Sequence, residues 1–286
     1  IVGNARQFNV DGAVPTNTTE RNILRAEAEN DWHRAEDIRL LAQLAALLHD
    51  LGKASVAFQE RLKGQRHERN LYRHEWVSLR LFLAFVGDDD DVEWLTRLAA
   101  DTAGDDSAWT AADRYLRDGV DGGIDRHPFR TLATRAPLAA AIGWLIVTHH
   151  RLPVVPVQRK DDAGQGWLGQ RAPRFEQAWL QEPLPRVAHD WNEIDPRCTP
   201  AQARPYWQLA GDLPTRMPAW RAQARRVARA LLDLQARRET DWLDNPQVMH
   251  LARLCLMLAD HHYSGLGLDK ADRPVGERQR FLQTGQ

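Results

Sequence analysis

Apolar residues recur at helical spacing through most of this sequence, and this periodicity limits the possible folds more than any other feature. Between residues 36 and 48 they occupy positions 38, 40, 41, 44, 45, 47 and 48, which form one face of a helix. No long alternating stretch indicates a sheet. Helices are therefore predicted over Thr18–Glu29, Glu36–Leu48, Ser55–Lys63, His74–Val86, Val92–Ala100, Ser107–Arg117, Pro137–Thr148, Pro218–Arg238 and Pro246–Tyr263.

The predicted fold class is all-α, an irregular helical bundle with one long, proline-rich insertion at roughly residues 152–216. Residues 17–264 are expected to form one domain, between an N-terminal linker, 1–16, and a C-terminal linker, 265–286. The chain begins at Ile1 rather than Met and ends in a polar stretch, so we expect it to be part of a longer polypeptide.

The composition is typical of a globular cytoplasmic protein, with 43% apolar and 27% charged residues. The longest apolar runs, Leu40–Leu48 and Ala136–Val147, are shorter than the ~20 residues that span a bilayer. Cys198 and Cys255 lie far apart in the sequence, which excludes a disulfide framework and a thiolate zinc site. With a net charge of −1, any contact with nucleic acid must come from a local basic patch.

The pair His49-Asp50 stands where the apolar helix 36–48 ends, and Leu51, Gly52 and Lys53 follow it. Both side chains can turn toward one point beyond the end of the helix. An imidazole nitrogen beside a carboxylate oxygen suits a divalent transition-metal ion. Gly52 would allow the backbone to bend sharply, and Lys53 would supply a positive charge suited to a phosphate. Phe58 and Gln59 are expected to support this loop.

Three further elements carry residues of the same chemistry. His74 opens a predicted helix in the string RHEWVS, and His149-His150 end the most apolar helix. Asp260 lies in the last apolar helix, within LMLADHHYS, where an ionisable group is costly unless it is paired or metal-bound. A helical bundle can bring such side chains to one cavity.

The order HD…H…HH…D resembles that of the HD phosphohydrolase superfamily. The strings HDLGKASVAFQ, RHEWVS, THH and ADHHYS resemble the HD nuclease domain of the CRISPR-associated helicase-nuclease of type I interference. The opening GNARQFNVDGAVPTNTTERNILR is similar to that of subtype I-F. The resemblance covers roughly Asn17 to Ser264.

The resemblance implies cleavage of single-stranded DNA with two divalent ions of iron, manganese, cobalt or nickel. Asp50 would bridge the two ions, which then clamp a phosphodiester and activate water, and Lys53 would stabilise charge on the phosphate. The other implied ligands are His49 and Asp260 for the first ion, and His74, His149 and His150 for the second. The implied partners are single-stranded DNA, a helicase domain in the same polypeptide, toward which residues 265–286 would lead, and the CRISPR targeting complex, with no membrane.

One departure from the family pattern concerns the first ion, which usually has a further histidine ligand from the first helix. No histidine precedes His33 in this chain. His33 is expected at the far end of the helix that leads to His49, about 20 Å away at ~1.5 Å per residue. Asn22 lies at the matching separation and is a possible weak ligand through its amide oxygen.

Other interpretations stay open at this point. The fold could serve an HD phosphohydrolase that acts on nucleotides or cyclic nucleotides, or an inactive protein-binding module. His49-Asp50 could be a helix cap, Asp260 could pair with an arginine, and Lys53 could merely extend its charge into solvent. His261 and His262 are interpreted as neighbours of the site or surface residues rather than ligands.

Seven arginines against a single acidic residue, Asp233, lie between residues 216 and 238. Arg221, Arg225 and Arg229 recur at helical spacing and are candidates for contacts with a DNA backbone. The alternative is a helix face that is simply solvated.

Overall fold

The computed structural model describes residues 33–100, 106–122, 128–129, 131–150, 197–238 and 240–265. The chain divides into two units, residues 1–35 and 36–286, and the second contains the elements described below. The predicted helix Thr18–Glu29 and the candidate ligand Asn22 lie outside the described residues. Within the described ranges the fold is helical, with Ser55 and Leu209 forming an isolated β-bridge, so the predicted all-α class is confirmed. No described helix is long and apolar enough to cross a membrane.

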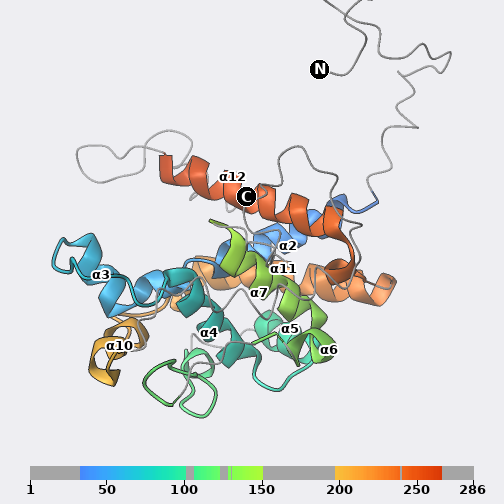
Figure 1. Cartoon of the computed structure of the whole chain (residues 1–286). Helices are drawn as coiled ribbons and strands as arrows, with labels where there is room; N and C mark the ends of the chain where they lie inside the picture. The colour runs from blue at the N-terminus through green and yellow to red at the C-terminus, as the bar shows by residue number, and fades with distance from the viewer. Residues whose placement is uncertain are drawn as a thin grey trace, which may run out of the picture. The chain divides into compact units, whose positions relative to one another are not determined.

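Figure 1 shows how the helices are arranged. In chain order they are α2 (Ala35–Leu48), α3 (Val56–Leu62), α4 (His74–Val86), α5 (Asp91–Ala99), α6 (Leu132–Arg135), α7 (Pro137–Thr148), α10 (Pro200–Trp207), α11 (Pro218–Arg237) and α12 (Pro246–Gly265). Short 3-10 turns are η2 (Leu51–Ala54), η3 (Ser107–Trp109), η5 (Pro214–Arg216) and η6 (Trp242–Asp244). Most helices match their predicted bounds because their apolar spacing and their early prolines are local signals.

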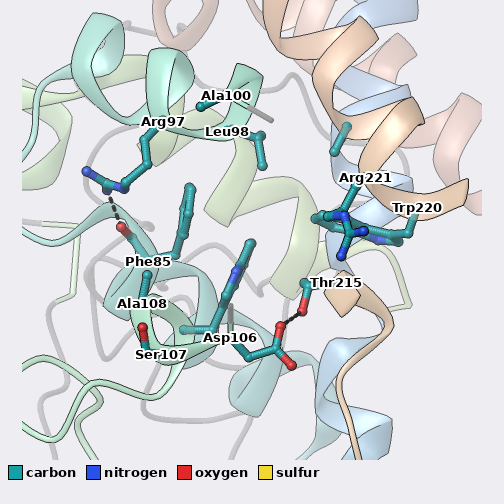
Figure 2. Close-up of a pocket in the computed structure, with 12 residues that line it drawn as sticks. Phe85, Arg97, Leu98, Ala100, Asp106, Ser107, Ala108, Thr215, Trp220 and Arg221 are labelled. Atoms are coloured by element: carbon teal, nitrogen blue, oxygen red, sulfur yellow. Dashed lines mark hydrogen bonds between the residues drawn. The ribbon is translucent and has the colours of Figure 1, made fainter. Parts of the chain in front are cut away.

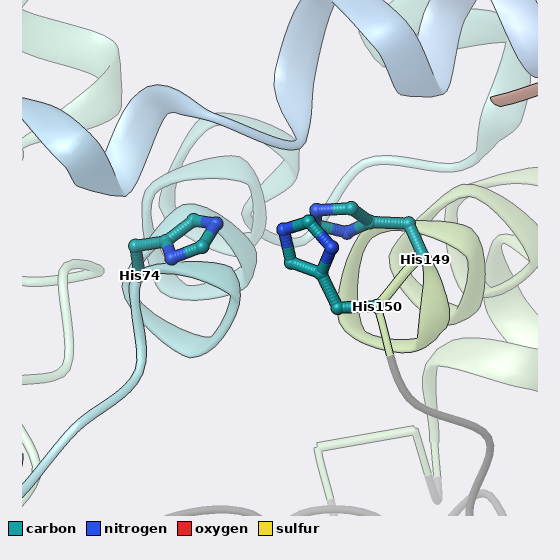
Figure 3. A group of neighbouring side chains, drawn as sticks. All are labelled: His74, His149 and His150. Carbon is teal, nitrogen blue, oxygen red and sulfur yellow. The ribbon is translucent and has the colours of Figure 1, made fainter. Parts of the chain in front are cut away.

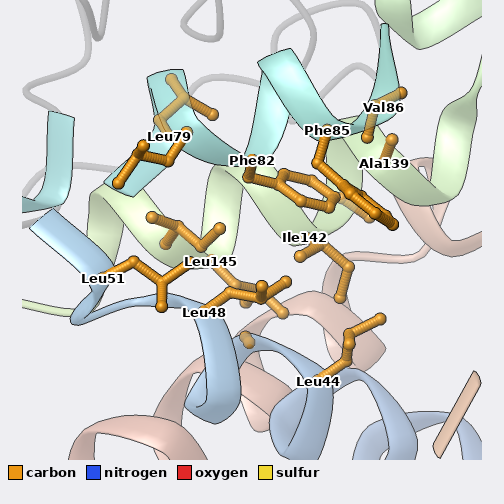
Figure 4. Close-up of a cluster of buried hydrophobic side chains, with 14 of the residues drawn as sticks. Leu44, Leu48, Leu51, Leu79, Phe82, Phe85, Val86, Ala139, Ile142 and Leu145 are labelled. Carbon is orange, nitrogen blue, oxygen red and sulfur yellow. The ribbon is translucent and has the colours of Figure 1, made fainter. Parts of the chain in front are cut away.

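The core forms where α2, η2, α4 and α7 bury their apolar faces against one another (Figure 4). Leu48, Phe82 and Ile142 are fully buried there. At Gly143 of α7, an added Cβ would lie 2.7 Å from the Phe129 ring and 2.9 Å from the Leu79 side chain. This close packing holds the C-terminal end of α7 in a defined position relative to α2 and α4.

A buried carboxylate from α5 caps the start of α7. Asp91 accepts hydrogen bonds from the backbone N–H groups of Leu138 and Ala139 at 2.7 and 3.0 Å, and from Trp94 Nε1 at 2.9 Å. The first N–H groups of a helix have no partner within the helix, so this carboxylate satisfies them and complements the helix dipole. Asp91 thereby sets where α7 begins.

Helix α11 runs antiparallel to α2, and polar side chains tie both ends. Near the start of α11, Trp220 Nε1 donates to the backbone oxygen of Leu47 at 2.9 Å. Beyond its end, the fully buried Asp37 of α2 pairs with Arg238 and accepts from Trp242 Nε1 at 2.7 Å. The basic helix therefore packs along the helix that ends in His49-Asp50.

The predicted helix Ser107–Arg117 was wrong, because only η3 forms there and turns follow it. Trp109 stacks on Phe85 with ring centroids 4.3 Å apart, and Tyr115 packs against Trp207. The two rings thus pack against partners from different parts of the chain, Phe85 of α4 and Trp207 of α10. The irregular backbone allows both rings to reach the core.

Residues 197–216, at the C-terminal end of the predicted insertion, are described and pack into the bundle. Helix α10 buries Tyr206 and Trp207, and Trp207 Nε1 donates to the backbone oxygen of Asp118 at 2.9 Å. Pro200 stands in the first turn of α10, where proline is tolerated, and Pro205 lies inside the same helix.

Candidate metal centre

His49 follows the last residue of α2 and is held by that helix. Its ring Nδ1 lies 2.9 Å from the backbone oxygen of Ala46, which can only accept a hydrogen bond. Nδ1 therefore carries the proton, and the lone pair stands on Nε2, facing away from the helix. The last carbonyls of a helix have no partner within the helix, so a histidine at this position naturally takes this orientation.

His149 repeats the same arrangement at the end of α7. Its Nδ1 lies 2.7 Å from the backbone oxygen of Ile146, and the side chain is completely buried. The rings of His49 and His149 meet edge to face with centroids 4.7 Å apart. Two buried imidazoles thus present their unprotonated Nε2 atoms to one another, which suits a metal ion and not a hydrogen bond.

His74 is the first residue of α4 and is oriented by its neighbour in the chain. Its Nδ1 lies 3.3 Å from Oε2 of Glu75, whose side chain is 1% exposed. Arg73 Nε donates to the other oxygen of Glu75 at 3.0 Å. Burial raises the pKa of Glu75, but the interactions with His74 and Arg73 outweigh burial and lower it. An ionised carboxylate on Nδ1 directs the Nε2 lone pair of His74 toward the site.

Asp50 lies between these histidines. Its Oδ2 is 3.4 Å from His49 Nε2, and its Oδ1 is 3.4 Å from His74 Nε2. Lys53 Nζ donates to Oδ2 at 2.7 Å. Burial raises the pKa of Asp50, yet His74, His49 and Lys53 together hold it well below its usual value. The carboxylate is therefore ionised, with one oxygen toward each of two histidines.

Four buried atoms converge here without a hydrogen-bond partner among the described residues, namely Nε2 of His49, His74 and His149 and Oδ1 of Asp50. Buried polar groups are nearly always satisfied, so four orphaned acceptors at one point need a common partner. Three imidazole lone pairs and a carboxylate oxygen match the donor set of a divalent transition-metal ion. Figure 3 shows His74 facing the rings of His149 and His150 from the opposite side of the site.

Asp260 of α12 completes the cluster from the other side. Its Oδ1 lies 3.7 Å from His49 Nε2, and its Oδ2 lies 3.9 Å from His150 Nδ1. Ser264 Oγ donates to Oδ1 at 3.4 Å. Within the described residues, the ionic partners of Asp260 are His49 and His150.

All six ligand candidates therefore lie close together, but the sets of ligands that they form share more members than the sequence suggested. Three sets of ligand atoms lie within 4.8 Å of one another: His49, Asp50 and His149; His74, His149 and His150; and His150, Asp260 and His261. His149 belongs to two sets, whereas the sequence assignment gave it to one ion. His33 precedes α2 and His49 follows it, so a 14-residue helix separates them as expected.

Two residues that support the site were missed from the sequence. Ser78 Oγ donates to the backbone oxygen of His49 at 2.7 Å and accepts from the backbone N–H of Gly52 at 2.8 Å. Glu75 orients His74, as described above. Both are buried polar residues on an otherwise apolar helix, and that contrast was the signal available. The expected support from Gln59 is confirmed, since its Nε2 donates to the backbone oxygen of Lys53 at 2.8 Å.

The three candidate DNA-binding arginines face two different hollows. Arg221 lines a cavity of about 220 Å³ beside Phe85, Trp109 and Trp220 (Figure 2). Arg225 and Arg229 line a separate, shallow depression along α11. Arg221 therefore lines a different hollow from Arg225 and Arg229, and a contact of these arginines with DNA stays a prediction.

The burial of His149 gives a prediction for the metal-free chain. Burial, with help from His49 and His150, lowers the pKa of His149 from 6.5 to about 3. The unfolded chain then binds a proton that the folded chain does not, so the free energy of unfolding should fall as pH decreases from about 6.5 toward 4. The slope from this one group approaches about 1.4 kcal/mol per pH unit.

Urea unfolding of the metal-free chain and of His149→Gln across this pH range checks the prediction. The variant should have a shallower dependence on pH, because glutamine does not titrate. Equal slopes in the two proteins would mean that His149 is protonated in the folded state.

Comparison with known proteins identifies relatives over more than nine-tenths of the chain. No protein-family model matches the chain. A protein of Pectobacterium atrosepticum named CRISPR-associated nuclease/helicase Cas3 subtype I-F/YPEST is 43% identical over 270 residues, which are 92% of this chain and 23% of that protein. A protein of the same name from Pseudomonas aeruginosa is 43% identical over 273 residues, 94% of this chain and 23% of its own.

The chain thus spans about a quarter of the length of the curated relatives that it matches. Identity of this level along nearly the whole chain agrees with the HD-type motifs and with the histidine and aspartate cluster that they form. Over nearly its whole length, the chain is therefore similar to one region of the CRISPR-associated nuclease/helicases Cas3, subtype I-F/YPEST.

Proposed function

We propose that this chain is a metal-dependent nuclease that hydrolyses phosphodiester bonds of single-stranded DNA in CRISPR interference. The observation that carries this function is the convergence of four buried atoms, from His49, Asp50, His74 and His149, that have no hydrogen-bond partner among the described residues. The relatives are named nuclease/helicases, and this name supports nucleic acid as the substrate of the cluster. A protein-binding module would have no use for such a cluster, which is costly without a cation.

We assign each ligand to one of two metal ions according to which ligand oxygens and nitrogens lie close to one another. Asp50 would bridge two ions, since its Oδ2 faces His49 and its Oδ1 faces His74. His49 and Asp260 would hold one ion, with Asn22 as a possible weak addition. His74, His149 and His150 would hold the other, and the identity of the metals is proposed as iron, manganese, cobalt or nickel. Two bound ions ~3.5–4 Å apart would polarise the phosphodiester and lower the pKa of water.

The remaining residues of the site prepare it for that chemistry. The carbonyls of Ala46 and Ile146 keep Nδ1 of His49 and His149 protonated, so that Nε2 is available as a ligand. The side chain of Lys53 is 34% exposed and bound to Asp50, and we assign it to the phosphate at the edge of the site. His150 is exposed in the described part of the chain, which leaves that side accessible to a polymer.

The proposed partners follow from the names of the relatives, which combine nuclease with helicase. We propose that a helicase region in the same polypeptide supplies single-stranded DNA in the cytoplasm after recruitment by a CRISPR targeting complex. Arg225 and Arg229 would contact the DNA backbone along α11, and Arg221 would contact it separately. Binding of a single-stranded oligonucleotide to Arg229→Gln tests this contact, because losing a phosphate contact lowers the dependence of affinity on salt.

The function is tested with the metal-free chain, supplied with Mn²⁺, Co²⁺, Ni²⁺ or Fe²⁺, on circular single-stranded DNA. We expect cleavage with at least one of these ions and none in the presence of a chelator. A panel of nucleotides and cyclic nucleotides is run beside it. Hydrolysis of the nucleotides without cleavage of DNA would replace this function by that of a nucleotide phosphohydrolase.

A further inference from the structure

His261 was expected to be a neighbour of the site or a surface residue, yet it belongs to one of the three sets of potential ligands. Its ligand atom and those of His150 and Asp260 all lie within 4.8 Å of one another. His150 and His261 are exposed, whereas His49 and His149, which belong to the other two sets, are buried. The set His150, Asp260 and His261 is called the outer site below.

Asp260 lies between the inner ligands and the outer site. Its Oδ1 faces His49 Nε2 at 3.7 Å, and its Oδ2 faces His150 Nδ1 at 3.9 Å. A carboxylate can bind one ion through each oxygen, so Asp260 can serve both sides at once. The outer site is anchored to the end of α7, because Arg253 Nε of α12 donates to the backbone oxygen of Thr148 at 2.7 Å.

His150 cannot serve both sides in the same way. A neutral imidazole has one N–H group and one lone pair, so it binds one ion at a time. The same ring is a member of the set His74, His149 and His150 and of the outer site. An ion in the outer site would therefore compete for His150 with the ion held by His74 and His149.

We propose that the outer site binds an additional divalent transition-metal ion and that this ion inhibits the enzyme. Two imidazoles and one carboxylate are a usual donor set for zinc, nickel, cobalt or manganese, with water completing the coordination. Because the two histidines of the outer site are exposed, its ion is held less tightly than the ions of the other two sets and binds only at higher concentration. The inhibitory role rests on the proposed nuclease function, whereas the binding site does not.

The test is a titration of the metal-free chain with Mn²⁺, in which the bound ions per chain are counted. We expect His261→Ala to bind about one ion fewer than the unchanged chain and to lose the weakest binding step. His250→Ala is the matched control, because His250 is an exposed histidine on the same helix, about 16 Å away at ~1.5 Å per residue. It should bind as many ions as the unchanged chain.

Cleavage of circular single-stranded DNA is followed in the same Mn²⁺ series. The rate of the unchanged chain and of His250→Ala should fall from its maximum at high Mn²⁺, and His261→Ala should keep most of its own maximal rate. Equal numbers of bound ions in His261→Ala and the unchanged chain overturn the outer site. An equal fall in rate overturns the inhibitory role. Loss of the ion without any cleavage supports the outer site and rejects the nuclease function instead.

Discussion

Asp50→Ala is expected to reduce metal-dependent cleavage to less than about a tenth of the parent rate with every metal, because a bridging carboxylate organises both ions. Its two oxygens lie 3.4 Å from His49 Nε2 and 3.4 Å from His74 Nε2, and alanine removes both. The number of bound ions should fall together with the rate. The measurements are the initial rate on circular single-stranded DNA and the metal content after dialysis.

The fold should survive this substitution, since Lys53, the ionic partner of Asp50, is one-third exposed and can be solvated. Circular dichroism must show a helical chain for the result to count. Asp113→Ala is the matched control, because its side chain is 78% exposed and its ionic partner among the described residues is the exposed Arg114. A cleavage rate above a tenth of the parent in Asp50→Ala would reject the two-ion assignment.

Gly52→Ala is expected to destabilise the fold and to weaken metal binding at the same time. An added Cβ would lie 2.1 Å from the backbone oxygen of His74, and 2.9 Å from both the backbone nitrogen of Ser78 and Val77 Cβ. Most of these contacts are backbone of α4, so the first turn of that helix must move. Such overpacking costs about 1–3 kcal/mol or more, and it displaces His74 from Asp50.

Urea unfolding and a metal titration measure the two effects together. Gly211→Ala is the control, since nothing lies within 4 Å of its added Cβ, and its stability should change by less than about 1 kcal/mol. A stable Gly52→Ala with unchanged metal affinity would mean that α4 can move away from η2 without cost to the site.

The role of Gly52 also shows what the sequence did not reveal. A bend of the backbone was expected there, and Gly52 lies in the turn η2, but it does not have the positive φ that requires glycine. What excludes a side chain is the approach of α4, which begins 22 positions later, at His74. A contact between segments far apart in the chain leaves no local pattern in the sequence.

The sequence alone determined those features of this protein that depend on residues close together in the chain. The apolar spacing predicted α2, α4 and α7, and it placed His49-Asp50, His74 and His149-His150 at the ends of those helices. Helix ends are where side chains are free to turn toward a common point, so the ligand types and their positions could be predicted. The failure at Ser107–Arg117 has the complementary cause, since the burial of Trp109 and Tyr115 by distant partners outweighed local helical preference.

Only the tertiary structure decided how these parts meet. The bond from Ser78 to the backbone of His49 joins residues 29 positions apart, and the set formed by His150, Asp260 and His261 depends on how α12 crosses the end of α7. The sharing of His149 and His150 between sets of ligands has the same origin. Periodicity specifies which face of a helix is buried, but the partner of that face and the distance between side chains follow from the packing of the whole core.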